Sequence, residues 1–293
     1  MKTAQSINYQ TLGDKMRYYK KHPFSLLAAI LVGLAALITV CVLFLLVGYI
    51  LIQGIPNITP DLFAWKYTSD NVSMMPAIIN TLTMTGITLI IAVPVGVFSA
   101  IYLVEYAKRG NKIVGLVRMT TETLAGIPSN VFGMFGYLIF LIAMKFGHSM
   151  MSGALTLAIM VLPTIMRTTE EALKAVPDSY REGSFGLGAG RLRTVFRVIL
   201  PSAVPGILSG VILSIGRIVG ETAALIYTSG TVAGIPDNLM GSGRTLSVHM
   251  YALLSEGLHT EEAYATAVVL LIMVILINAL SGFAAKKIQS NKG

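Results

Sequence analysis

Cysteine is almost absent from this 293-residue sequence, since Cys41 is the only one. A single cysteine cannot form an intramolecular disulfide or supply the paired thiolates of a zinc site. The four histidines are scattered, and the zinc-protease spacing H-E-x-x-H does not occur. The phosphate-binding pattern G-x-x-x-x-G-K-S/T is also missing. These absences argue against a metalloenzyme and against ATP hydrolysis by this chain.

Charged residues are scarce as well. They make up 12% of the chain, whereas soluble proteins carry roughly 25%. Hydrophobic residues reach 54%, and the mean hydropathy is +0.73. The net charge of +8 comes from basic residues in short runs between apolar segments. This pattern suits a membrane surface better than nucleic acid, so we expect an integral membrane protein without a nucleic-acid partner.

Six apolar segments are long enough to cross a membrane, which takes about 20 helical residues. The first follows a basic stretch, but its apolar core of 27 residues is too long for a cleavable signal peptide, so we expect a retained helix. The fold class predicted is therefore all-α, with about six transmembrane helices. The predicted segments are 26–52, 75–104, 124–144, 151–166, 204–228 and 263–285.

The distribution of lysine and arginine predicts the orientation of these helices. Loops rich in these residues stay in the cytoplasm. The N-terminal segment, the loops after the second and fourth helices, and the C-terminal tail together hold 17 basic residues, whereas the alternate loops hold three. Both termini are therefore predicted to be cytoplasmic.

Proline and glycine occur inside the predicted helices. Pro94 and Pro163 should kink or interrupt the backbone, which a membrane tolerates where neighbouring helices or a wet cavity satisfy the freed carbonyls. Two pairs of glycines, 206 with 210 and 216 with 220, have the four-residue spacing that places both members on one helix face. Each pair should let another backbone approach closely, either as ordinary helix packing or as a moving hinge.

The predicted cytoplasmic loop 171–203 is the most informative stretch. It predicts a short helix capped by Asp178 or Ser179, a glycine-rich turn, and a second helix limited by Pro201 and Pro205. One side of the second helix is apolar and the other is basic, which suits either a membrane interface or a groove in a partner. The apolar positions are Leu192, Val195, Phe196 and Ile199, and the basic ones are Arg191, Arg193 and Arg197.

The same loop resembles the EAA signature of ABC importer permeases: Glu-Ala-Ala, three residues, Gly, nine residues, Ile, one residue, Leu-Pro. Two small residues replace the alanines, and Val198 replaces the isoleucine. The resemblance implies a helix that couples the chain to a cytoplasmic ATPase; the alternative is a basic amphipathic loop that only anchors the helices. The implied coupling residues are Glu182, Gly183, Ser184, Gly188, Leu200 and Pro201.

Four further segments resemble the A-type permease family of the phosphate-specific transport system. They are residues 102–106 (YLVEY), 125–129 (AGIPS), 167–170 (RTTE) and 217–223 (RIVGETA). The first 70 residues contribute little to this resemblance. In that family, arginines and glutamates at the matching places are implicated in phosphate passage. The resemblance therefore assigns Arg167, Glu170, Arg217 and Glu221 to a substrate pathway.

Physical chemistry supports these four residues independently. An arginine near the bilayer centre costs about 2.5 to 3.5 kcal/mol, so it is usually retained for a function. Arg217 lies roughly 20 Å into its predicted helix, whereas Arg167 closes a helix near the cytoplasm, where its side chain can reach the surface. Glu170 and Glu221 follow their arginines by three and four residues, so each could neutralise its neighbour. Two purely structural ion pairs remain the alternative.

The sequence thus predicts a permease with a cytoplasmic segment 1–25, a first helix 26–52, a permease domain 75–285 and a tail 286–293. The resemblance implies half of a phosphate pathway in a prokaryotic cytoplasmic membrane. It also implies three kinds of partner: a related second permease, two ATP-binding cassette ATPases carrying ATP and Mg, and an extracytoplasmic phosphate-binding protein. No cofactor or metal is expected on this chain. The alternatives are a permease for sulfate or molybdate, an ATP-independent carrier or channel, and a membrane scaffold for signalling.

Overall fold

The computed structural model describes residues 22–108 and 110–290, which form helices and no strands. The chain divides into two units, residues 1–52 and 53–293. Most of the predicted cytoplasmic segment 1–25, Arg109 in the predicted second cytoplasmic loop, and the last three residues of the tail lie outside the described residues. Five described helices are long and apolar enough to cross a membrane, or six if one bent pair forms a single span.

Helix α2 (Pro23–Gly54) forms nearly all of the described part of the first unit. It extends the predicted segment by a few residues at each end. No charged residue interrupts it, and nearly all of its side chains are apolar. A helix that is apolar all round is buried in protein or surrounded by lipid. Lipid or another protein surface is therefore expected to surround α2.

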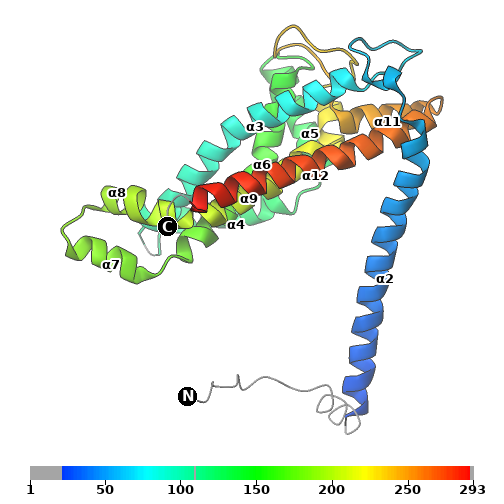
Figure 1. Ribbon diagram of the computed structural model, residues 1–293. Coiled ribbons are helices and arrows are strands. Elements are labelled where there is room, and N and C mark those ends of the chain that lie inside the picture. The colour runs from blue at the N-terminus through cyan, green and yellow to red at the C-terminus, as the bar shows by residue number, and fades with distance from the viewer. Residues whose placement is uncertain (1–21, 109, 291–293) are drawn as a thin grey trace. The chain divides into compact units, whose positions relative to one another are not determined.

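Four long helices build the second unit (Figure 1): α3 (Met75–Ile101), α6 (Met150–Lys174), α9 (Leu200–Gly220) and α12 (Thr260–Ser290). Helix α3 continues as a π-helical turn, η3 (Tyr102–Tyr106). Within this unit, α7 and α8 lie at one end and α11 lies at the other. The short elements are η1 (Ile55–Asn57), η2 (Pro60–Phe63), α7 (Asp178–Gly186), α8 (Arg191–Thr194), α10 (Ala223–Thr228) and α11 (Leu246–Glu256).

The third predicted helix, 124–144, is not a straight span. Helix α4 (Lys112–Ala125) is followed by α5 (Ser129–Gly136) and the π-helical η4 (Tyr137–Ala143), with a bend of 108° between the two parts. Pro128 sits at the break, where its ring removes a backbone donor and favours extended backbone before it. The hydrophobic pattern located the segment, but it did not reveal the bend or the amphipathic helix before it.

The fifth predicted helix, 204–228, is also wrong at both ends. A continuous helical stretch, Arg191–Gly220, runs through α8, the π-helical η5 (Val195–Ile199) and α9, so Pro201 and Pro205 do not end it. A π-helical turn is a common way to accommodate a local disruption of the helical ladder. At the other end, α9 stops at Gly220 and α10 begins at Ala223. The break places Glu221 outside a helix.

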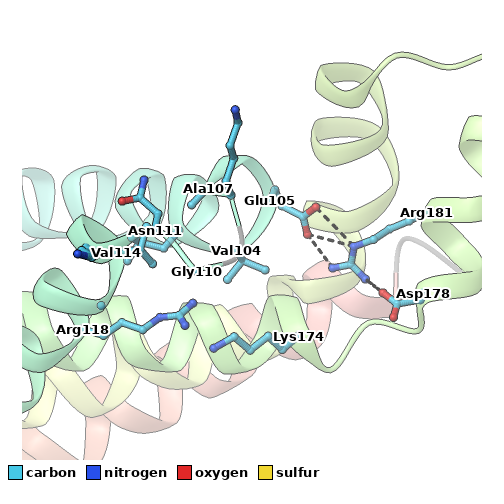
Figure 2. Close-up of a pocket in the computed structure, with 14 residues that line it drawn as sticks. Val104, Glu105, Ala107, Gly110, Asn111, Val114, Arg118, Lys174, Asp178 and Arg181 are labelled. Atoms are coloured by element: carbon cyan, nitrogen blue, oxygen red, sulfur yellow. Dashed lines mark hydrogen bonds and ion pairs between the residues drawn. The ribbon is translucent and has the colours of Figure 1, made fainter.

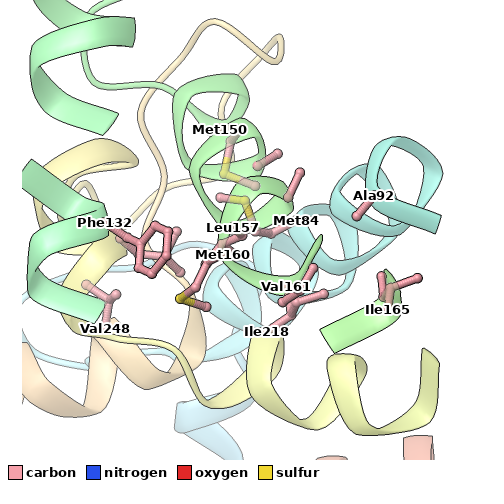
Figure 3. Packing of buried hydrophobic residues seen from close by; sticks show 13 residues of the cluster. Met84, Ala92, Phe132, Met150, Leu157, Met160, Val161, Ile165, Ile218 and Val248 are labelled. Atoms are coloured by element: carbon pink, nitrogen blue, oxygen red, sulfur yellow. The ribbon is translucent and has the colours of Figure 1, made fainter. Parts of the chain in front are cut away.

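The core of the second unit forms where α6 packs between α3 and α9 (Figure 3). Met84 of α3, Leu157 and Met160 of α6, and Ile218 of α9 are almost fully buried there. The third side is closed by α5 and α10, which contribute Phe132 and other apolar side chains to the same cluster. This packing holds α6 and α9, the helices that carry Arg167 and Arg217, in one rigid layer.

Close helix contact through glycine is confirmed for the first predicted pair. A Cβ atom added at Gly206 would lie 2.6 Å from the Ala172 Cβ, and one added at Gly210 would lie 2.6 Å from the Thr168 Cβ. Both neighbours belong to α6, so the α6–α9 contact requires glycine at these positions. The second predicted pair differs, since a Cβ at Gly216 would only reach Asn278 at 4.0 Å and one at Gly220 would meet nothing.

Replacing Gly210 by alanine is expected to destabilise the protein by about 1 to 3 kcal/mol, because a new methyl group overpacks the α6–α9 contact. Gly220→Ala is the matched control in the same helix, because a Cβ there meets no atom within 4 Å. The measurement is the fraction of monodisperse protein left after heating in detergent, read by size-exclusion chromatography. Equal melting of both variants would contradict the tight packing at Gly210.

The predicted orientation can be tested with two exposed positions, Ser179 at the start of α7 and Asn238 between α10 and α11. Each is changed to cysteine in a Cys41→Ala background, and an impermeant thiol reagent is applied to intact cells. The Asn238 site is expected to react and the Ser179 site to stay unlabelled until the cells are opened, because the basic loops should stay inside. Labelling of Ser179 in intact cells would reverse the topology.

Candidate functional site

Arg167 and Glu170, both on α6, do not pair with each other. The Arg167 Nε donates to the Glu171 carboxylate at 3.0 Å, one residue beyond the predicted partner, and both side chains are exposed. The predicted mutual neutralisation of Arg167 and Glu170 is therefore wrong. The i,i+4 spacing brings side chains onto one face of the helix, and a glutamate stands at that position as well.

Glu170 instead joins two other cations. Its Oε2 accepts a hydrogen bond from Lys174 Nζ at 2.8 Å and lies 3.2 Å from Arg118 Nη2. Arg118 comes from α4, so this carboxylate ties the bent segment to the C-terminal half of α6. Glu170 is 8% exposed, and a carboxylate buried to this degree is normally paired. Sequence reasoning missed Arg118 and Lys174 because both looked like ordinary loop charges.

Arg217 lies in the last turn of α9, half-buried, and pairs with no carboxylate among the described residues. It lines a pocket of about 580 Å³ together with Asn278 of α12 and Thr164 of α6. The Asn278 Oδ1 is shielded from solvent and has no hydrogen-bond partner in the described chain. An unpaired guanidinium beside hydroxyl and amide groups is suited to hold an anion moderately. Asn278 was not predicted from the sequence. Its position as a single amide within an apolar segment is the feature that could have identified it.

Glu221 has a different role from the one predicted. Its Oε1 accepts a hydrogen bond from the Ala224 N–H at 3.1 Å, and its carbonyl accepts one from the Ser247 hydroxyl at 2.6 Å. The carboxylate thus satisfies a free N–H in the first turn of α10, where negative charge is also favourable. The predicted neutralisation of Arg217 by Glu221 is wrong, because the helix ends between them.

Three adjacent pockets are lined by these residues. The Arg217 pocket shares Thr164 and Leu213 with a second pocket of about 430 Å³, which contains Arg167 and Glu170. This second pocket shares Arg118 and Lys174 with a third of about 790 Å³, which reaches the start of α7. Arg167, Glu170 and Arg217 therefore line neighbouring pockets, whereas Glu221 lines none of the three.

The coupling loop has the predicted helix–turn–helix form, but its details differ. Helix α7 starts after Pro177, and neither Asp178 nor Ser179 caps it through a side-chain hydrogen bond. No residue of α7 is buried, so its outer face is free for another protein. Gly188 in the turn has φ +80°, a left-handed conformation that favours glycine. Glu182, Gly183 and Gly188 are exposed, whereas Leu200 and Pro201 lie half-buried in the following helix.

The second helix of this loop buries only part of its predicted apolar face. Val195 and Ile199 are buried, whereas Leu192 and Phe196 are exposed. Ser184, which stands where the EAA signature has alanine, forms a 2.8 Å hydrogen bond with the buried Thr194 hydroxyl. This departure from the signature thus adds a side-chain hydrogen bond between α7 and α8.

Arg181 fastens α7 to the membrane helices, and sequence reasoning did not anticipate it. Its guanidinium donates to Glu105 in η3, with the shortest distance 2.7 Å (Figure 2). It also donates to the carbonyl of Leu173 in the last turn of α6 and to that of Val176 just after this helix. Asp178 accepts a further bond at 3.1 Å. The hydrogen bond to Glu105 raises the pKa of Arg181 above its usual value. We call this set of contacts the Arg181 clamp.

The helix arrangement is that of known importer permeases. A chain of a bacterial ABC transporter involved in the import of the acidic polysaccharide alginate superposes with a TM-score of 0.66 at 16% identity, covering 92% of this chain and 99% of that one. A chain of the MetNI methionine ABC transporter superposes with a TM-score of 0.58 at 21% identity, over 76% and 99%. Both likenesses show that the fold is that of ABC importer permeases.

The family follows from sequence similarity. Residues 92–291 match the family described as binding-protein-dependent transport system inner membrane component, and the chain belongs to it. The probable ABC transporter permease YqgI of Bacillus subtilis is 33% identical, over 90% of this chain and 97% of its own. The phosphate transport system permease PstA 1 of Mycobacterium tuberculosis is 36% identical over 69% and 67%, and PstA of Pasteurella multocida is 32% identical over 77% and 81%. The resemblance stated from the sequence is thereby confirmed at the level of the family.

Proposed function

We propose that this chain is the permease subunit that forms half of the pathway for inorganic phosphate in an ATP-driven importer. The observation that carries this proposal is the row of adjacent pockets lined by Arg217, by Arg167, and by Arg118 with Lys174. Relatives named as phosphate transport permeases support the choice of anion. A row of pockets of this kind attracts a dianion by its cations and keeps the binding moderate by interspersed carboxylates, so the ion can leave again.

The remaining assembly is proposed from the family. A related second permease supplies the other half of the pathway, and two ABC ATPases bind ATP and Mg and dock on α7. An extracytoplasmic phosphate-binding protein delivers the ion, and both ends of the chain lie in the cytoplasm of a prokaryote. The exposed outer face of α7 and the Arg181 clamp, which ties α7 to η3 and α6, support a coupling role for residues 182–188. No cofactor is proposed on this chain itself.

Radiolabelled phosphate uptake tests this function. The chain is expressed with its genetic partners in a strain deleted for its own phosphate importers, and uptake is followed with and without excess sulfate or molybdate. We expect ATP-dependent phosphate accumulation that neither competitor reduces. Uptake of sulfate or molybdate in place of phosphate would support the second candidate, a permease for another oxyanion. Uptake that persists without the ATPase subunits would point to a carrier or channel.

A further inference from the structure

A pocket at the predicted cytoplasmic end of this row of pockets lies beside the coupling loop. Its volume is about 790 Å³, and it is formed by the end of α3 with η3, the start of α4, the end of α6 and the start of α7. Figure 2 shows Arg118 and Lys174 pointing toward one another across it, with the Arg181 clamp at its edge. A cavity of this size can admit an anion with part of its hydration shell or a lipid headgroup.

The charges that line this pocket are mainly positive. Five basic side chains and two acidic ones face it. Both acidic groups, Glu105 and Asp178, are already engaged by Arg181. The four basic residues left are Lys108, Lys112, Arg118 and Lys174.

Only one carboxylate among the described residues offsets these four cations. Glu170, from the neighbouring pocket, contacts Arg118 and Lys174 through the same oxygen, Oε2. Neither Lys108 nor Lys112 forms an ion pair with any described residue. The Arg118 Nε is shielded from solvent and has no hydrogen-bond partner in the described chain. The pocket therefore presents more donors and positive charge than the described chain neutralises, which is the condition for binding an anion.

We propose that this pocket is a second anion site, which binds a phosphate-type group through Lys108, Lys112, Arg118 and Lys174. Lysine ammoniums and a guanidinium are the donors that phosphate oxygens prefer. The group is either free phosphate leaving the path or the phosphodiester of an anionic lipid. The free-phosphate form rests on the proposed function, whereas the lipid form does not.

A reporter cysteine tests this proposal. Gly115 of α4 lines the pocket and is exposed, and a Cβ added there would meet no atom within 4 Å, so Gly115→Cys in a Cys41→Ala background should be tolerated. The purified full transporter is placed in nanodiscs of neutral phosphatidylcholine. The rate of reaction with a negatively charged thiol reagent is then read on this chain by intact mass spectrometry. The pocket's cations should raise the local concentration of this anionic reagent and so speed its reaction by about tenfold or more.

Two results would support the site. In neutral nanodiscs, millimolar phosphate should slow the reaction about tenfold relative to chloride at equal ionic strength, if the occupant is free phosphate. In nanodiscs containing phosphatidylglycerol, the reaction should already be slow without phosphate, if the occupant is a lipid headgroup. Either protection should be lost in the Lys108→Gln/Lys112→Gln variant. It should be retained in Lys66→Gln/Lys145→Gln, which removes the same charge from loops predicted to lie outside the cell.

Three results would overturn it. The first is a reaction that neither phosphate nor anionic lipid slows, and the second is equal protection in both lysine variants. The third is a cysteine that reacts only after the ATPase is removed, since a partner subunit would then cover the pocket. Phosphate uptake is measured on the same variants: a transporter that imports another oxyanion fails that test and can still show lipid protection here. The two proposals therefore fail separately.

Discussion

Arg217→Gln is expected to lower phosphate uptake by about 10- to 100-fold, the loss that follows from removing a charge-assisted hydrogen bond of about 1.5 to 3 kcal/mol. Assembly should survive, because Arg217 pairs with no described carboxylate and its removal leaves no described carboxylate without a partner. Arg217→Lys should be intermediate, since an ammonium keeps the charge but loses the planar fork. Initial uptake rates, together with co-purification of the ATPase, provide the measurement.

Glu221 supplies the internal control for this prediction. If the two residues formed a structural pair, Arg217→Gln/Glu221→Gln would restore transport, as happens when both charges of a buried pair are removed. The structure gives the opposite expectation, because Glu221 caps α10 instead. Glu221→Gln keeps an acceptor for the Ala224 N–H and should transport nearly normally, whereas Glu221→Ala should lose about 1 kcal/mol of stability with that cap. Recovery of uptake in the double variant would refute the assignment of Arg217.

Breaking the Arg181 clamp should uncouple ATP hydrolysis from transport. In Arg181→Met, Glu105 is left 9% exposed without its guanidinium, which should cost about 3 kcal/mol, the lower end for breaking a buried pair. Helix α7 then loses the hydrogen bonds that join it to η3 and to the end of α6. A movement of α7 is therefore no longer transmitted to α6, the helix that carries Arg167. We expect the ATPase subunits to stay bound while phosphate transported per ATP falls severalfold. Uptake and ATPase activity are measured together in proteoliposomes.

The position-matched control is Arg193→Met, which removes an arginine from the same loop where the side chain is exposed and has no carboxylate partner among the described residues. It should leave the coupling ratio near that of the parent. Exchange of the two charges, Glu105→Arg with Arg181→Glu, should recover part of the lost stability. A normal coupling ratio in Arg181→Met would show that the clamp only stabilises the loop.

Local sequence patterns located the membrane helices because burial in lipid acts on whole segments. Any segment of about 20 apolar residues satisfies its backbone as a helix, whatever it packs against. The hydrophobic pattern gave inaccurate helix bounds at residues 124–144 and 204–228. Pro128 interrupts the first of these segments, and the pair Glu221–Thr222 interrupts the second. Hydropathy averages over such breaks. Pro94 and Pro163 lie inside helices that continue past them, so proline alone does not identify a break either.

Charge pairing was the least predictable feature of the site. Spacing along one helix suggested Arg167 with Glu170 and Arg217 with Glu221, and neither pair forms. Glu170 pairs with Lys174, four residues later on the same helix, and with Arg118 from another helix, more than 50 positions earlier in the sequence. The Arg181–Glu105 pair likewise joins residues 76 positions apart. Which partners on different helices meet depends on how the helix ends come together in the fold. The spacing of residues along one helix does not encode this arrangement.

The sequence alone determined that the chain is an integral membrane protein and that its coupling loop has the EAA spacing. It also determined that Arg167 and Arg217 are charged residues at the edge of or inside apolar segments, where charge is rare. Each of these depends on composition or on distances along the chain. Only the tertiary structure decided that three cation-lined pockets are adjacent, that Asn278 lines the Arg217 pocket, and that Arg181 links α7 to η3. These features arise between helices, because the α6–α9 glycine contacts and the bend after α4 set which side chains meet.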